Sequence, residues 1–204
     1  TTVAITGAAL QCVVNNASLF VPDEGANFDE AQALAQIKVN LMAPMRFGKW
    51  MAALHTHADA AEETASAGNA NASATQRAKP SVIHVLDQKV FNLNPDYFSY
   101  TLSKLALERA VSLQAQSLAP TLRVNAVAPG LMYPSGPQTQ DNFNRAANAN
   151  LLRQPINPAD VASSVVFLAG NASITGTTVR VDNGQHLVPL ARDVMFVVEE
   201  LFKS

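Results

Sequence analysis

Short apolar segments alternate with long helical patterns along this chain. The apolar segments are rich in Val, Ile and Thr, which is typical of buried strands, and they cover residues 1–6, 11–18, 80–86, 122–128 and 176–182. Apolar residues recur near a helical spacing over residues 29–54, 97–118, 158–168 and 192–203. This alternation predicts an α/β fold with a mainly parallel sheet and helices on both faces.

The composition is that of an ordinary globular domain, and we expect one domain over residues 1–204. A net charge of −2 gives no reason to expect nucleic acid or an anionic membrane surface as a partner. No apolar run is long enough to predict a membrane span, and a strand-like segment begins almost at Thr1, which argues against a signal peptide. The single cysteine, Cys12, excludes an internal disulfide and predicts a reducing, cytoplasmic location.

The segment around Gly7 is unusual, because a second strand-like segment begins only a few residues after the first. Thr6, Gly7 and Ala8 look like the opening of a glycine-rich loop that binds a dinucleotide pyrophosphate. Neighbouring parallel strands need a crossover of a dozen or more residues, and no hairpin turn is present here. We therefore expect that residues of the protein are absent between Leu10 and Gln11. The alternative is a natural deletion that abolishes the cofactor site.

Tyr100 and Lys104 lie four residues apart near the start of the predicted helix 97–118. Four residues are just over one helical turn, so both side chains are expected on one face. A cation close to a phenol favours the phenolate, so Lys104 is predicted to lower the pKa of Tyr100. Such a pair suits proton transfer near neutral pH, although the spacing also arises by accident.

An acid and an amide stand at two further positions of interest. Asp87 follows the strand 80–86, at the edge where open α/β sheets bind ligands, although acids at strand ends are commonly turn formers. Asn40 lies among apolar neighbours in the predicted helix 29–54, which Pro44 should kink or break. It is expected to form a structural hydrogen bond, or to lie beside a distortion that exposes a backbone carbonyl.

Two polar stretches are predicted to be connections between elements. Residues 55–79 should form an exposed connection, partly helical or mobile, in which His55 and His57 are solvated. With no third ligand nearby, we expect no metal site there. Residues 133–150 carry prolines and several asparagines, and are predicted to form a loop or lid beside the site.

Taken together, the motifs resemble the short-chain dehydrogenase/reductase family of nicotinamide-dependent Rossmann enzymes. The residues that match occur in the order of the family and span the chain: Thr6, Gly7, Ala8, Asn15, Asn16, Ala17, Asn40, Tyr100, Lys104, Asn125, Pro129, Gly130, Ile174, Gly176, Val181, Asp182, Asn183 and Gly184. The resemblance implies a Rossmann-like, doubly wound fold and an NAD(P)-dependent oxidoreductase. It also implies a homo-oligomer, a dimer or a tetramer built on the two long helices.

The catalytic serine of the family is replaced by Asp87, a departure that resembles the pteridine reductases, which use Asp, Tyr and Lys. Ser18 and Phe20 also resemble the segment in which a serine contacts cofactor and ligand and a phenylalanine stacks on the pterin. For Phe20, a plain core or rim aromatic is an equally good interpretation. Met132 stands where a small hydroxyl residue often contacts the carboxamide.

The resemblance assigns a role to each candidate residue. Catalytic roles fall to Asp87, Tyr100, Lys104 and Asn40, the last as the anchor of a water. Cofactor binding falls to Gly7, Asn16, Ala17, Ser18, Tyr100, Lys104, Pro129, Gly130 and Leu131, and substrate binding to Ser18, Phe20, Asp87 and Tyr100. The implied cofactor is NADP, with NAD left open.

The predicted reaction is hydride transfer from the reduced nicotinamide to a C=N or C=O carbon of a small, flat, pterin-like substrate. Two alternatives stay open at this point. One is a general carbonyl or 3-oxoacyl-thioester reductase with an unusual acid. The other is a Rossmann-fold binding protein that has lost cofactor affinity.

Overall fold

A computed structural model describes residues 10–66, 79–136 and 138–201 of the chain. The expected strand 1–6, and with it Gly7 and Ala8, lies outside these residues, and the predictions made for them stay predictions.

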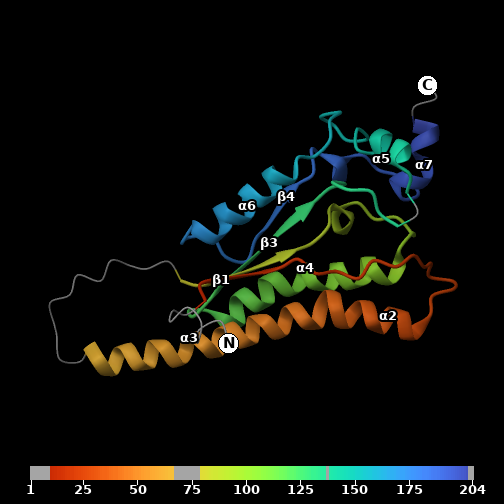
Figure 1. The fold of residues 1–204 in the computed structure, drawn as a ribbon. Helices are drawn as coiled ribbons and strands as arrows, with labels where there is room; N and C mark the ends of the chain where they lie inside the picture. The colour runs from red at the N-terminus through yellow and green to blue at the C-terminus, as the bar shows by residue number, and fades with distance from the viewer. Residues whose placement is uncertain (1–9, 67–78, 137, 202–204) are drawn as a thin grey trace.

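The core of the fold is a parallel sheet of four strands (Figure 1). The strands are β1 (Cys12–Asn15), β2 (Ser81–Val85), β3 (Arg123–Pro129) and β4 (Thr178–Val181), and they lie in the order β1-β2-β3-β4. All three pairs are parallel, with Asn15 opposite His84 and His84 opposite Ala126. Their carboxyl ends therefore meet at one edge, which is where parallel α/β sheets bind ligands.

Helices cover both faces of this sheet, as Figure 1 shows. Helices α3 (Ala43–Ser66) and α4 (Phe98–Leu118) lie on one face, and α6 (Pro158–Gly170) lies on the other. Val82 and Val124 pack in one core cluster with Met51 of α3, whereas Ile83 packs in another with Leu168 of α6. Each such fully buried side chain contributes about 1.5–3 kcal/mol. The predicted α/β fold is confirmed.

The helical region before α3 is distorted where the sequence predicted a break. Helix α2 (Glu30–Ile37) begins at Asp29, whose side chain accepts a hydrogen bond from the Gln32 amide at 2.8 Å. It runs into a π-helix, Lys38–Met42, and α3 follows directly. Pro44 has no N–H to continue the α-helical bonding, which explains a change of pitch just before it. Asn40 lies inside the π-helix and is buried.

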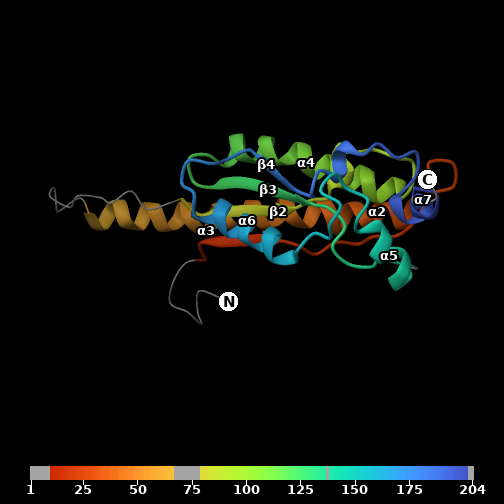
Figure 2. The same ribbon diagram turned by 90° about the horizontal axis from the view of Figure 1, so that it is seen from above.

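Two short helices lie together at the carboxyl edge of the sheet (Figures 1 and 2). Helix α5 (Gln140–Ala146) packs on α7 (Val194–Leu201) through Ala146, Val194 and Val198. The expected helix near the end of the chain is therefore present and docked on its own domain. The prediction of a loop over residues 133–150 is corrected, because Thr139 caps α5 by accepting a hydrogen bond from the Asn142 amide at 3.3 Å.

The region after residue 55 is partly helical, as one of the two expectations had it, but His55 differs from expectation. Helix α3 continues to Ser66, through a stretch rich in alanine, which has the highest helix propensity. His55 is buried, and its Nε2 atom lies 2.8 Å from the carbonyl oxygen of Leu10, so it is not a solvated loop residue. The side chain of His57 and residues 67–78 lie outside the part of the chain that the structure describes.

The described residues show neither a membrane-spanning helix nor a cluster of metal ligands. No helix among them is long and apolar enough to cross a membrane. They also contain no group of three or more His, Cys, Asp or Glu side chains that could hold a metal ion.

Candidate active site

The first turn of α4 is held by the loop that follows β1. Tyr97 precedes the helix in a left-handed conformation, with φ +56°, and offers no side-chain cap. Asp23 replaces that cap: its Oδ1 accepts from the Ser99 amide at 3.0 Å, and its carbonyl accepts from the Phe98 amide at 3.2 Å. A carboxylate is also favourable at the positive end of a helix. Tyr100, which lies in this first turn, is thereby fixed relative to the sheet.

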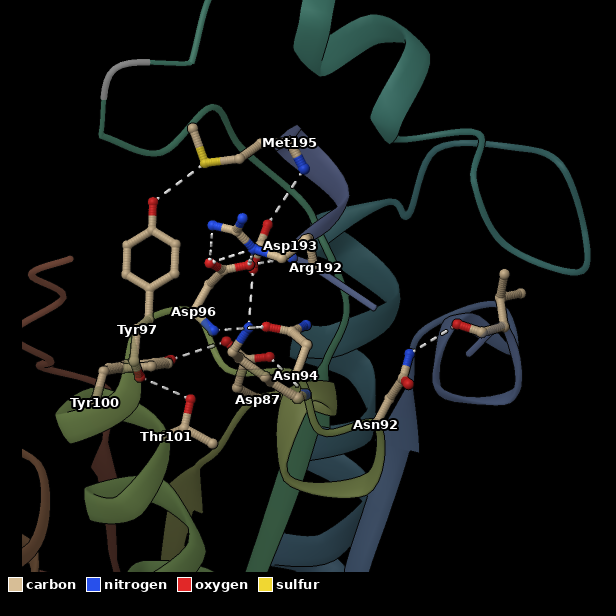
Figure 3. Close-up of polar contacts among 12 residues, drawn as sticks. Asp87, Asn92, Asn94, Asp96, Tyr97, Tyr100, Thr101, Arg192, Asp193 and Met195 are labelled. Carbon is tan, nitrogen blue, oxygen red and sulfur yellow. Dashed lines mark hydrogen bonds and ion pairs between the residues drawn. The ribbon is translucent and has the colours of Figure 1, made fainter. Parts of the chain in front are cut away.

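Tyr100 and Asp87 meet at the carboxyl end of β2 (Figure 3). The phenol of Tyr100 donates a hydrogen bond to Oδ2 of Asp87 at 2.8 Å. The other carboxylate oxygen, Oδ1, accepts from the amide of Lys89 at 2.8 Å, which caps a short 3-10 helix, Gln88–Phe91. Asp87 is thus both the turn former that its position suggested and a direct partner of Tyr100.

Lys104 lies beside this pair but does not contact the phenolic oxygen. Its ammonium donates to the carbonyl oxygen of Val85 at 2.8 Å, and lies 5.7 Å from the centre of the Tyr100 ring. The side chain is buried, and this burial lowers the pKa of Lys104 to about 8, with the carboxylate of Asp87 acting in the opposite direction. An amine with that pKa exchanges protons close to neutral pH.

The pKa of Tyr100 moves in the opposite direction from the one predicted. Burial raises it well above 10, and the charge and hydrogen bond of Asp87 raise it further, whereas a contact with Ser18 lowers it. The prediction that Lys104 lowers this pKa is therefore wrong for this arrangement, because the nearest charge to the phenol is a carboxylate. The phenol is neutral at physiological pH, and its proton lies in the hydrogen bond to Asp87.

Asn40 ties the loop after β1 to α4. Its Oδ1 accepts from the Leu19 amide at 2.7 Å and from the Ser18 hydroxyl at 3.2 Å. Its Nδ2 donates to the Leu19 carbonyl at 2.8 Å and to the Ser103 hydroxyl at 2.9 Å. The expected structural hydrogen bonding is present, and the water-anchoring role stays a prediction. The neighbouring residues Asn16, Ala17 and Ser18 are exposed at the carboxyl edge.

Phe20 lies against both tyrosines of the site. Its ring stacks on Tyr97 at 4.0 Å between centroids and 17° between planes, and meets Tyr100 edge-on at 4.6 Å and 87°. Phe20 is thus a rim aromatic packed on its neighbours and also a wall of the cavity. The two interpretations left open for this residue do not exclude each other.

A cavity of about 300 Å³ opens at this edge of the sheet. Phe20, Asp87 and Tyr100 line it, and so do Gly130 and Leu131 after β3. Tyr133 and Ser135 also line it and belong to the stretch that was predicted to lie beside the site. The sequence missed six other polar lining residues, which are Gln88, Lys89, Asn92, Asn94, Gln185 and Asp193. Gln88 and Lys89 could have been suspected because they follow Asp87 directly, but Asp193 comes from a distant segment and carries no local signal.

Three of these missed residues, Lys89, Asn94 and Asp193, belong to a polar network that joins the cavity wall to α7 (Figure 3). Lys89 is buried and its ammonium binds Asp193 Oδ2 at 3.0 Å and also the side chain of Asn94. The backbone amide of Asp193 donates to Asp96 Oδ2 at 2.6 Å, and Arg192 grips the same carboxylate through Nε and Nη2, the shortest contact being 2.6 Å. The network holds the last helix over the site.

Comparison with known proteins places this fold and site in a wider group. A family model described as "Enoyl-(Acyl carrier protein) reductase" matches residues 50–186, which is more than half of the chain. The dihydromonapterin reductase of Citrobacter koseri is 30% identical over 110 residues, covering 54% of this chain and 46% of that protein. The chain thus spans about half the length of the curated relatives it matches.

Solved structures are similar over most of the chain. FolM alternative dihydrofolate reductase 1 from Brucella canis, complexed with NADP, is 33% identical with a TM-score of 0.75, covering 91% of this chain and 66% of that one. The corresponding protein of Brucella suis, also in complex with NADP, is 34% identical with a TM-score of 0.74, covering 88% and 65%.

The parallel sheet and the Tyr-Lys pair at its carboxyl edge define a Rossmann-like α/β protein. The chain belongs to the short-chain dehydrogenase/reductase family. Its relatives include the dihydromonapterin reductases and the FolM proteins, so the resemblance to pteridine reductases is confirmed.

Proposed function

We propose that the protein is an NADPH-dependent reductase of a flat C=N or C=O substrate, with a dihydropterin as the substrate class. The observation that carries the proposal is the 2.8 Å hydrogen bond from Tyr100 to Asp87 inside a cavity that Phe20 also lines. A proton donor, a carboxylate and an aromatic wall on one cavity are the groups that reduction of a planar heterocycle requires. The relatives named for pterin and folate reduction support this choice.

The residues at the carboxyl edge fit the nicotinamide end of a dinucleotide. Asn16, Ala17 and Ser18 leave exposed backbone and small side chains after β1, and Lys104 brings ammonium donors beside them. Pro129, Gly130 and Leu131 would line the same end of the site. Such a cofactor supplies the hydride when it is bound. Gly7, the residue proposed for its pyrophosphate, lies outside the described residues.

Proton supply is the task proposed for this chain's own side chains. Tyr100 donates its phenolic proton to the substrate, since its raised pKa keeps it protonated at physiological pH. Asp87 orients the hydroxyl and binds the substrate on the same wall. Lys104, whose pKa is about 8, returns a proton to the phenol through water, and the backbone carbonyl of Asn40 anchors that water, because the Asn40 side chain is fully paired.

The thioester alternative is less well matched by the cavity. Its wall mixes two carboxylates, Asp87 and Asp193, and several amides with apolar side chains such as Leu131, Met132 and Leu190, whereas a long acyl chain needs a continuous apolar channel. Acceptor-rich walls suit a substrate that carries several N–H groups, as the pyrimidine edge of a pterin does.

The test is turnover by the purified full-length protein. We expect NADPH consumption that depends on added dihydropterin and none with an acetoacetyl thioester. Turnover of the thioester alone would establish the general carbonyl reductase instead. Absence of a thermal shift with both NADPH and NADH would establish a binding protein without cofactor affinity.

We also propose that the gene encodes further residues between Leu10 and Gln11. The support comes from the Brucella canis protein: 91% of this chain aligns with it, but the alignment covers only 66% of that protein. Sequencing the gene tests this, and a basic residue in the added segment would support NADP over NAD. An uninterrupted coding sequence across Leu10 and Gln11 would contradict the proposal.

A cytoplasmic homo-oligomer, a dimer or tetramer, completes the proposal. The two long helices carry large apolar side chains exposed to solvent, among them Phe47 and Trp50 on α3 and Leu102 and Leu113 on α4. Light scattering of the purified protein distinguishes a dimer or tetramer from a monomer. The lone Cys12 fits a reducing compartment.

A further inference from the structure

Gln88 carries a buried hydrogen-bond acceptor that has no partner among the described residues. Its side-chain oxygen, Oε1, is shielded from solvent and makes no hydrogen bond. Leaving such a group unpaired costs about 1–3 kcal/mol, so buried polar atoms in proteins are nearly always paired. Among the described residues, Asp23 Oδ2 and Gln36 Nε2 are also buried without a partner, but only Gln88 of these three residues lines the candidate active-site cavity.

The other amide and carboxylate side chains of this wall already have partners. Asp87 accepts from Tyr100 and from the Lys89 amide, and Asp193 accepts from Lys89. Gln185 accepts from the Leu131 amide, Asn94 accepts from Lys89, and Asn92 donates to the Val188 carbonyl. Among the amide and carboxylate side chains of this wall, Gln88 is therefore the one with a buried atom that has no partner.

The position of Gln88 is fixed by the same residue that contacts Tyr100. It opens the 3-10 helix Gln88–Phe91, and Asp87 is the capping residue of that helix, with its Oδ1 accepting from Lys89 at 2.8 Å. The backbone of Gln88 is thus held next to the Asp87–Tyr100 pair. Its side-chain amide is therefore a candidate for binding the substrate at this pair.

We propose that Gln88 is a specificity-determining residue: its side chain turns toward the cavity when substrate binds, and its Oε1 then accepts a hydrogen bond from a ring N–H or amino group of the substrate. This rests on the proposed function and deepens it, because it requires a substrate with an N–H group close to the reacting ring. A site built to hydrogen-bond such a group rejects an analogue that lacks it, since the acceptor is then left unpaired.

The test compares Gln88→Met with wild type on two substrates. One is a dihydropterin, and the other is the same compound with its ring N–H methylated. Wild type should prefer the N–H compound, and Gln88→Met should reduce that preference in kcat/KM about tenfold by weakening only the N–H compound. Gln88→Glu, which keeps an acceptor, should retain the preference. Gln154→Met, at an exposed position outside the cavity lining, is the matched control and should behave as wild type.

Thermal unfolding without substrate separates this role from a structural one. Gln88→Met removes an unpaired polar atom, so its melting temperature should equal or exceed that of wild type. A large decrease in melting temperature, or an unchanged preference in the variant, overturns the proposal.

Failure of the proposed function gives a different result. If wild type turns over neither compound, that function is wrong, and the preference is then measured by calorimetric titration of the same two compounds. Selective binding of the N–H compound that Gln88→Met abolishes still supports the role of Gln88. Equal binding of both compounds, or binding of neither, overturns it.

Discussion

The phenol of Tyr100 donates a 2.8 Å hydrogen bond to the carboxylate of Asp87. The two residues come from different elements, one from the end of β2 and one from the first turn of α4. The carboxylate adds to the effect of burial in raising the pKa of Tyr100. Within the proposed function, the pair is a neutral acid with a fixed orientation.

Replacing Asp87 by Asn should lower kcat for dihydropterin by about 10² or more, because the acceptor for the phenol is lost. The fold should persist, since the Asn Oδ1 can still accept from the Lys89 amide. Steady-state kinetics measure the effect. Asp141→Asn, which changes an exposed acid on α5, is the control. Unchanged activity in Asp87→Asn would refute the assignment of this residue.

Tyr100→Phe should lose activity by about 10²–10⁴, the range expected for removing a positioned proton donor. The ring contacts with Phe20 are kept, so the melting temperature should change little. Cofactor affinity should fall less than kcat, which a fluorescence titration with NADPH can show. Retention of kcat in the phenylalanine variant would assign the proton donor to another group.

Gly130→Ala should destabilise the protein and disturb the cavity. A Cβ atom at this position would lie 2.5 Å from Gln185 Oε1 and 2.5 Å from Ile156 Cδ1. Gln185 Oε1 also accepts the Leu131 amide at 2.9 Å, so that bond should be lost as well. We expect a cost of about 1–3 kcal/mol in denaturant unfolding. Gly170→Ala, where a Cβ would meet nothing within 4 Å, is the control, and equal stabilities of the two variants would contradict the clash.

Asp96→Asn should loosen the last helix. The buried carboxylate of Asp96 binds Arg192 and the amide of Asp193, just before α7. These bonds lower the pKa of Asp96 even though burial acts in the opposite direction. The variant should lose about 1–3 kcal/mol and exchange amide hydrogens of α7 faster. Glu24→Gln, which removes an exposed partner 3.6 Å from Arg192, should have little effect. Equal exchange rates in α7 for both variants would show that Asp96 does not hold it.

His84 should make the protein less stable in mild acid. It is buried between Asn15 and Gln114, with ring-nitrogen contacts of 3.1 and 2.9 Å, and burial lowers its pKa from 6.5 to about 4. Between those values the unfolded chain binds a proton that the folded protein does not. Stability therefore falls as the pH drops from about 6.5 to about 4, by up to about 3 kcal/mol.

The His84→Gln variant keeps one donor and one acceptor but does not titrate. Between pH 6.5 and pH 4, this variant should lose up to about 3 kcal/mol less stability than wild type does. Urea unfolding at the two pH values measures both losses. Carboxylates common to both proteins cancel in this difference. Identical losses would show that His84 does not titrate on unfolding.

Sequence periodicity located most of the elements that the structure describes. The strand segments around Val82 and Val124, and the helix that carries Tyr100, are local patterns that burial and spacing make visible. The break before Pro44 was equally local, because it follows from the missing N–H. The apolar pattern was weak over residues 55–66 and in α5. Alanine propensity stabilises the first helix and capping the second, and a polar composition does not reveal either effect.

The candidate site divides along the same line. Short-range spacing was enough to predict that Asp87 ends a strand and that Tyr100 and Lys104 share a helix face. The packing of distant elements brings the phenol to the carboxylate and Lys104 to the Val85 carbonyl, and this reversed the expected direction of the pKa shift of Tyr100. Lys89 and Asp193 form an ion pair although they are 104 residues apart in the sequence. Gln88 Oε1 has no hydrogen-bond partner because of the residues that surround it in the fold. Burial and long-range contacts are properties of the packed chain, so no local pattern could encode them.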